Sequence, residues 1–359
     1  MDLQTLLDSI QELSDLELGV LLCLIAQGHC LMTTEDTLLD DLATELSLIV
    51  SERFGLSYCV LEHEDLESVE RFNAAILEEK KRQFPSENNV HSDLLQSEPQ
   101  HVTVRPDLKS QDEEGFNGKM IKNVVIAKGF NFAHEYVQVQ AIEIINNRRI
   151  LSHTTVYPAP KTFLFLPIVT ASTNNVHLIP HLNDRIFISH YHLPEHGFVN
   201  LEELDHPKSS DASSHPSSQG DLWEVQRSSR LICKDVVGKI RAMGDAAVIT
   251  PEVRRYLQDI VTFLRLERGV DSGLTPRATS EFVALAKYLA PLHGIGFVTP
   301  SLVMLAARKV YPHRIVIAEP GRERSMQYGS DLATIAELLD GLTPPEVIEA
   351  ALNTVQCPI

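Results

Sequence analysis

The chain has few cysteines and no recognisable cysteine motif. Its five cysteines are scattered along the sequence, and no two of them form a CxxC pair. The sequence therefore indicates neither a disulfide framework nor a zinc ribbon. Apolar neighbours surround these residues, which predicts reduced thiols in the core. The cysteines are Cys23, Cys30, Cys59, Cys233 and Cys357.

Basic residues are also scarce, and long apolar runs are missing. With 31 lysines and arginines against 49 acids, the formal net charge is −18. Nucleic acids and anionic membranes repel such a chain, so neither is expected as its main partner. No apolar run is long enough for a membrane span, and residues 1–19 predict an acidic amphipathic helix rather than a targeting signal. We therefore expect a soluble cytoplasmic protein without membrane insertion.

The apolar residues that are present suffice for a sizeable core. Of the 359 residues, 43% are hydrophobic and 22% are charged, which is typical of a globular protein with two domains of ordinary size. Two polar stretches with little apolar periodicity divide the chain, and the second is rich in serine and proline. The predicted organisation is a core made of residues 1–78 and 119–204, a mobile insertion at 79–118, a disordered linker at 205–220, a helical domain at 221–318 and C-terminal helices at 319–359.

Short apolar runs alternate with helical periodicity in the first part of the chain, which predicts an α/β domain. In the helix expected at 133–147, Val137, Ala141 and Ile144 share one face that can pack against a sheet. After residue 221 the pattern is helical, apart from one short strand at 315–318. The other expected elements are helices at 16–28 and 36–55 and strands at 29–32, 56–62, 123–127 and 162–170.

The segment from Leu274 to Ile315 predicts two capped helices. Thr275 and Thr299 are each followed by proline, which places a hydroxyl at the N-cap and a fixed φ at the first helical position. Apolar residues then recur at helical spacing after each threonine. This pattern alone is typical of an ordinary helical hairpin in a core.

Four sequence strings of the same segment resemble those of a known family. The strings TPRAT, LAPLHG, FVTPSLV and HRI resemble the helical lid of the AAA+ ATPases of the magnesium-chelatase I-subunit and MoxR group. Residues 123–150 resemble the Walker-B strand and following helix of that group, and residues 163–189 resemble its sensor-one strand and P-x-L-L-D-R-F string. The resemblance implies an α/β fold: an AAA+-type αβα core, like that of P-loop NTPases, followed by a helical lid. It also implies ATP and magnesium as cofactors, and an oligomer with itself or with other AAA+ subunits.

The residues that would hold ATP and magnesium are missing. A phosphate loop needs G-x-x-x-x-G-K-[ST], which the sequence nowhere contains. In its place Glu35 and Asp36 occupy a helix start, where carboxylates compete with phosphate for the positive helix end. Lys128 stands where a Walker-B strand would be followed by its magnesium-binding aspartate, and Glu135 or Glu143 could substitute as a base or simply lie on an exposed helix face. The sequence therefore predicts no ATP hydrolysis in the chain's own site.

Residues that such ATPases turn towards a neighbouring subunit are retained. Asp184 and Arg185 match the family's D-R pair, whose arginine is the finger inserted into the adjacent subunit's site. The alternative for Arg185 is a structural salt bridge with Asp184 or another acid. Arg277 matches the sensor-two arginine, which reaches from the lid to the nucleotide phosphates. Asn174 or Asn175 is the candidate for sensor one.

Three histidines form a separate candidate site. His190, His192 and His196 converge on a transition metal if the first two share one face of a strand and a turn brings the third back. The alternative is that these histidines are exposed at the end of a strand and bind nothing. The sequence supplies no obvious carboxylate to orient the rings.

Three functions remain open on the sequence. The leading interpretation is a magnesium-chelatase-like or MoxR-like AAA+ protein that cannot hydrolyse nucleotide and serves as an assembly or regulatory subunit. The first alternative is an active ATP-dependent subunit of the magnesium-chelatase type with non-standard nucleotide loops. The second is a protein-interaction scaffold that is independent of nucleotide.

Overall fold

The computed structural model describes residues 10, 12–79, 119–152, 155–171, 178–205, 232 and 234–358. The insertion predicted at 79–118 and the linker predicted at 205–220 lie outside these residues, apart from Glu79 and Asp205. Asn174, Asn175 and Cys233 lie outside them as well.

Five parallel strands form the central sheet, in the order β2-β5-β8-β1-β9. In β1, Met32 is aligned with Ile168 on one side and with His190 on the other. The first four strands of this order confirm those expected from the apolar runs. The strands are β1 (Cys30–Thr34), β2 (Tyr58–Leu61), β5 (Val124–Ala127), β8 (Leu164–Thr170) and β9 (Ile188–Tyr191).

Helices cover both faces of this sheet. Successive strand residues point to opposite faces, so Val124 and Ile126 join one hydrophobic cluster while Val125 and Ala127 join the other. The first cluster includes residues of α2 (Asp15–Ala26) and α3 (Leu39–Leu48), and the second includes residues of α4 (Val69–Ile76), α5 (Glu135–Asn147) and α6 (Pro180–Asn183). The result is the αβα core that the sequence predicts.

Two antiparallel two-stranded sheets at the margin of the core were not predicted. One pairs β3 (Leu77–Glu79) with β4 (Lys119–Ile121), and the other pairs β6 (Arg149–Ser152) with β7 (Thr155–Pro158). Their strands are too short to give a clear alternation of apolar and polar residues. A further short helix, α7 (Val199–Asp205), follows the core strands.

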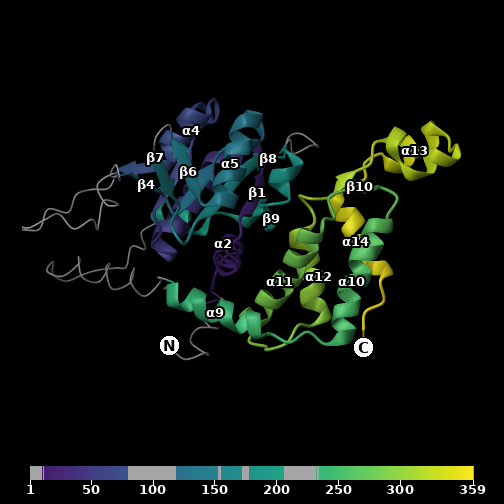
Figure 1. The fold of residues 1–359 in the computed structure, drawn as a ribbon. Helices are drawn as coiled ribbons and strands as arrows, with labels where there is room; N and C mark the ends of the chain where they lie inside the picture. The colour runs from purple at the N-terminus through teal and green to yellow at the C-terminus, as the bar shows by residue number, and fades with distance from the viewer. Residues whose placement is uncertain are drawn as a thin grey trace, which may run out of the picture.

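The second domain is a bundle of helices beside the sheet (Figure 1). Its helices are α9 (Lys234–Ala246), α10 (Pro251–Leu266), α11 (Pro276–Leu292) and α12 (Pro300–Val310). The hydroxyls of Thr275 and Thr299 accept hydrogen bonds from the amides three residues on, as expected of N-caps. Both predicted helix starts are therefore confirmed.

The C-terminal part adds a small sheet and two helices. The strand expected at 315–318 is confirmed as β11 (Val316–Ile317), but its antiparallel partner β10 (Val270–Ser272) was not predicted because it has only three residues. Helix α14 (Pro344–Thr354) begins with a capping box of Thr343 and Glu346. Helix α13 (Leu332–Leu339) stands apart from the bundle (Figure 1).

The bundle and the sheet share one hydrophobic cluster, and several polar contacts cross between them. The guanidinium of Arg241 on α9 donates to the carbonyls of Leu24 and Ile25, the last turn of α2. Buried Arg314 donates to the carbonyl of Ile186, at the entry to β9, and pairs with Glu281 on α11. These contacts fix the position of the bundle against the amino-terminal edge of the sheet.

The prediction of core thiols holds for only part of the cysteines. Cys23 and Cys30 are buried free thiols, and burial is the main cause that raises the pKa of Cys23 well above its ordinary value. Cys59 is half-buried, and Cys357 is exposed, so the prediction of a core thiol was wrong for Cys357.

Candidate functional site

Ligands of open parallel sheets bind at the edge where the strands end. At that edge, β1 is followed by Glu35 and by a short turn of 3-10 helix, Asp36–Leu38, before α3 begins. The loop contains no glycine, and Glu35 and Asp36 are both exposed. Bare backbone amides that could surround a phosphate group are therefore replaced by carboxylates.

An internal ion-pair network occupies the same edge. Lys128 directly follows β5, and its Nζ lies 2.8 Å from Oδ1 of Asp40 and 2.6 Å from Oε2 of Glu62. Burial acts to lower the pKa of Lys128, but the hydrogen bonds to these two carboxylates outweigh it and raise the pKa. The Lys128 side chain is only 14% exposed. A lysine ammonium thus stands between two carboxylates at the position that the resemblance assigns to the magnesium-binding aspartate. The alternative bases Glu135 and Glu143 are both exposed.

A second feature lies at the opposite, amino-terminal edge of the sheet. Here a pocket of about 320 Å³ opens between the core and the helical bundle. Three guanidinium groups and one carboxylate line it, together with a histidine and the backbone before β1. The residues that line the pocket include Gly28, His29, Arg148, Arg185, Arg277 and Glu281.

The arginines of this pocket come from three separate elements. Arg148 ends α5 with a left-handed φ of 52°, Arg185 follows α6, and Arg277 lies in the first turn of α11. Arg277 donates to Oε1 of Glu281 at 2.9 Å, and the same carboxylate also pairs with Arg314. Within the described part of the chain, Arg148 and Arg185 have no ion pair. The pocket is therefore positively charged although the chain carries a net charge of −18.

His29 also lines the pocket formed by Arg148, Arg185 and Arg277, which we call the arginine pocket, and its ring is neutral. Its Nδ1 accepts the backbone N–H of Phe165 at 3.0 Å, which places the ring proton on Nε2. Burial lowers the pKa of His29 to about 3, with further contributions from the charges of Arg148 and Arg277. The neighbouring Gly28 cannot be replaced without a clash, because a Cβ there would lie 2.5 Å from Cβ of Phe187.

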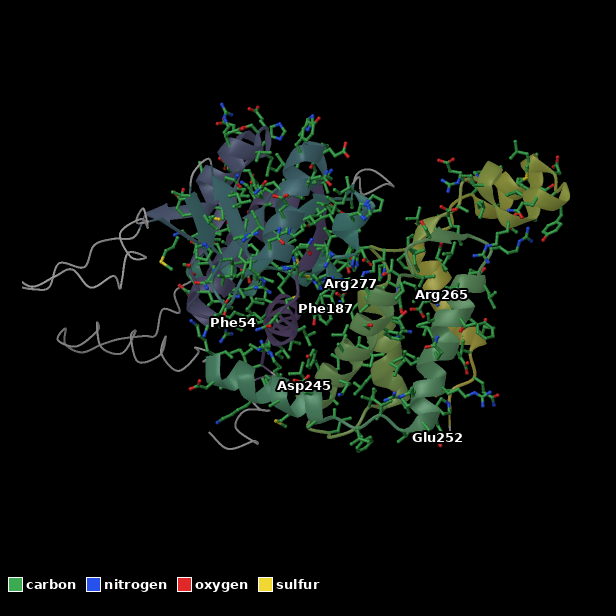
Figure 2. All side chains as sticks on the ribbon, viewed as in Figure 1. Phe54, Phe187, Asp245, Glu252, Arg265 and Arg277 are labelled. Carbon is green, nitrogen blue, oxygen red and sulfur yellow. The ribbon has the colours of Figure 1, made fainter. Side chains whose placement is uncertain are left out.

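The structure brings together two of the residues that the sequence singled out. Arg185 and Arg277 line the same pocket, and Figure 2 shows Arg277 and Phe187 at the junction between the sheet and the bundle. Asp184 does not pair with Arg185; it accepts a hydrogen bond of 2.5 Å from the hydroxyl of Thr275, the N-cap of α11. The alternative of an Asp184–Arg185 salt bridge is thus not observed.

Arg277 lies far from the loop that replaces the phosphate loop. The pocket adjoins Gly28 and His29, before β1, whereas the loop begins at Glu35, after β1. The five residues of β1 separate the two by roughly 16 Å, at about 3.3 Å per residue. In this structure Arg277 does not face a nucleotide position at the carboxyl edge of its own sheet.

Sequence reasoning missed His29, Arg148, Asp40 and Glu62. No local pattern marks them, since each acquires its role from a contact with a residue distant in the sequence. The left-handed conformation of Arg148 could not be predicted either, because glycine or asparagine usually occupies a left-handed position at a helix end.

The three histidines also lie close together, at the carboxyl end of β9. His190 and His192 are 5% and 2% exposed, so the alternative that they are exposed at a strand end was wrong for both. His196 is exposed and lies on the turn that follows. One ring nitrogen from each histidine lies within 4.8 Å of the others.

The chain has the fold of the AAA+ ATPases, an αβα core with a helical lid. The model of the AAA lid domain family matches residues 263–335, which cover the end of α10, helices α11 and α12, and the segment up to α13. The crystal structure of a candidate ATPase from Cytophaga hutchinsonii superposes with a TM-score of 0.59 over 99% of this chain and 94% of that chain, at 14% identity. At this identity the likeness concerns the fold alone.

Similar sequences carry the name maintenance of telomere capping protein 2. The protein of Lachancea thermotolerans is 32% identical over 95 residues, that of Kluyveromyces lactis 29% over 101, and that of Eremothecium gossypii 29% over 129. These matches cover 25%, 27% and 34% of this chain. They span only 33%, 37% and 45% of the respective relatives.

None of the helices in the described part of the chain is both long enough and apolar enough to cross a bilayer.

Proposed function

We propose that this chain is a subunit of an AAA+-type assembly that organises or regulates its neighbours without hydrolysing ATP in its own site. The observation that carries the proposal is the contact of Lys128 with Asp40 and Glu62. A magnesium ion at this end of β5 would meet the ammonium group of Lys128, and like charges at such short range repel strongly. Nucleotide phosphates would in addition meet Glu35 and Asp36 at the start of α3.

A role towards a neighbouring subunit is supported by the state of Arg185. Its side chain is half-buried and forms no ion pair among the described residues, although acids outnumber bases in this chain. A guanidinium group without an internal partner is available to an anion from outside, such as a nucleotide phosphate of an adjacent subunit. The resemblance to the magnesium-chelatase and MoxR group assigns the same residue to this task. We therefore propose an oligomer, formed with itself or with other AAA+ subunits.

The names of the relatives indicate where such a subunit can be sought. Proteins named for the maintenance of telomere capping match part of this chain. With a net charge of −18, this chain would contribute to such a process through protein partners rather than through direct contact with DNA.

The first experiment is calorimetric titration of the purified chain with ATP and ADP in the presence of magnesium, together with a phosphate-release assay. We expect no turnover. Turnover that disappears in a Lys128→Ala variant would refute the proposal and support the active ATPase with non-standard loops. Nucleotide binding that weakens in Arg277→Ala would assign the phosphates to the arginine pocket.

A second experiment tests Arg185. Sedimentation velocity, with and without ATP and magnesium, compares the unmodified chain with Arg185→Ala and Arg149→Ala. Arg149 is exposed, so Arg149→Ala serves as the control. The proposal expects Arg185→Ala to weaken assembly while Arg149→Ala leaves it unchanged. Equal behaviour of all three proteins, without nucleotide binding, would favour a scaffold that is independent of nucleotide.

A further inference from the structure

His190, His192 and His196 meet where the chain leaves the central sheet. His190 lies on β9, His192 follows the last residue of that strand, and His196 ends the 3-10 turn Pro194–His196. The ring centroids of His192 and His196 lie 5.5 Å apart, and that of His190 lies 6.2 Å from the first and 6.4 Å from the second. Two adjacent elements thus direct three imidazole rings to one small region.

The two buried rings have nitrogen atoms without partners among the described residues. In that part of the chain, Nε2 of His190 and both ring nitrogens of His192 form no hydrogen bond. An unpartnered polar atom in the interior is unfavourable, and native structures usually satisfy it with protein, water or an ion. The ring of His192 is held in place, since it stacks on Phe198 with centroids 4.8 Å apart. Its backbone is also fixed, because His192 N–H donates to the carbonyl of Thr33 at 2.8 Å.

We propose that His190, His192 and His196 bind one divalent transition-metal ion, and that zinc fits the site best. Three imidazoles without a thiolate or carboxylate suit zinc and its neighbours in the first transition row. Tetrahedral zinc with Zn–N bonds of about 2.0–2.1 Å needs ligand nitrogens roughly 3.3 Å apart. The observed limit of 4.8 Å requires the rings to draw together, which exposed His196 can do on its turn. Water would complete the coordination.

Two polar contacts must open when the ion binds. Nδ1 of His190 lies 3.4 Å from Nζ of Lys309, and Nδ1 of His196 accepts the N–H of Leu193 at 3.3 Å. Both contacts leave Nε2 as the ligand atom, and coordination by Nε2 places the ring proton on Nδ1. Lys309, on α12, must therefore turn away. The positive charge of Lys309 repels the ion, whereas the negative charge of Asp15, on α2, favours positive charge at His190.

The test uses the full chain without an affinity tag, freed of metal by a chelator. Zinc is titrated by calorimetry, and cobalt by the visible absorption that tetrahedral Co²⁺ shows. We expect one ion per chain, and a loss of affinity of at least about 100-fold in His196→Ala, because one of three ligands is removed. His196 is exposed, so this variant should fold, which circular dichroism verifies. His63→Ala, which removes another exposed histidine, is the matched control and should bind zinc normally.

Lys309→Met provides an independent readout. Removing the charge that opposes the ion should tighten zinc binding about tenfold. The assignment is overturned if zinc binds no tighter than about 100 µM, or if His196→Ala and His192→Ala bind zinc as tightly as the unmodified chain. Weaker binding by Lys309→Met would also contradict it, since the lysine would then support the ion instead of competing with it.

Discussion

Replacing His29 by asparagine should change how the stability of the protein depends on pH. The imidazole is buried, and its Nδ1 accepts the N–H of Phe165. Asparagine keeps an acceptor oxygen at a similar distance from the backbone but cannot take up a proton. The variant therefore separates the titration of the side chain from its hydrogen bond.

The size of the effect follows from the two pKa values. Burial holds the pKa of His29 at about 3 in the folded protein, whereas an unfolded histidine has a pKa of about 6.5. Above about pH 6.5 neither state binds a proton at this position, so the stability is unaffected there. As the pH falls below that value, the unfolded state takes up a proton and the folded state does not. Each pH unit then lowers the free energy of unfolding by about 1.4 kcal/mol, down to the folded pKa.

When the pH falls from about 7.5 to about 5, proton uptake by His29 in the unfolded state should therefore lower the free energy of unfolding of the unmodified protein by about 2 kcal/mol. His29→Asn should not show this decrease. Urea unfolding followed by circular dichroism measures both proteins at both pH values. Other histidines whose pKa is lowered, such as the half-buried His313, titrate in the same direction but are present in both proteins, so they cancel in the comparison. His63→Asn, at an exposed position, serves as control. Parallel pH dependence of the native protein and His29→Asn would refute the reasoning.

Four other substitutions test the packing, a helix cap and the ion pairs by urea unfolding. Gly28→Ala should destabilise by at least about 2 kcal/mol because its Cβ would collide with Phe187, whereas Gly19→Ala, with no atom within 4 Å of its Cβ inside α2, should stabilise by up to about 1 kcal/mol. Thr275→Val removes the N-cap of α11 and its bond to the core, and should cost about 1–2 kcal/mol; an unchanged midpoint would contradict that role. Lys128→Met should cost about 1 kcal/mol or less, because its two partners are exposed, and high salt should reduce the difference.

Much of the fold could be predicted because its signals are local. The strand 124–127 is a continuous run of apolar residues, and such a run indicates a strand buried on both faces. The helix starts at Thr275 and Thr299 follow from a hydroxyl beside a proline, a relation between neighbours in the chain. The loss of the phosphate loop and of the Walker-B acids is equally visible, since those motifs are defined by short strings of residues.

The short elements escaped prediction for the opposite reason. Strand β10 has three residues and is stabilised by pairing with β11, which lies more than forty positions further along the chain. Such a strand has too few residues to show a period of its own.

The sequence by itself determined that the chain forms an αβα core with a helical lid, and that it lacks the motifs for hydrolysing ATP. Only the tertiary structure decided which charges meet. Lys128 and Asp40 are 88 positions apart, and Arg148, Arg185 and Arg277 share a pocket only because α5, α6 and α11 end or begin at the same edge of the sheet. The burial of His190 and His192 was likewise not predictable, because it depends on the position of β9 beside β1 and the lid. Contacts between distant residues depend on the path of the whole chain, whereas caps, strands and motifs depend on neighbouring residues.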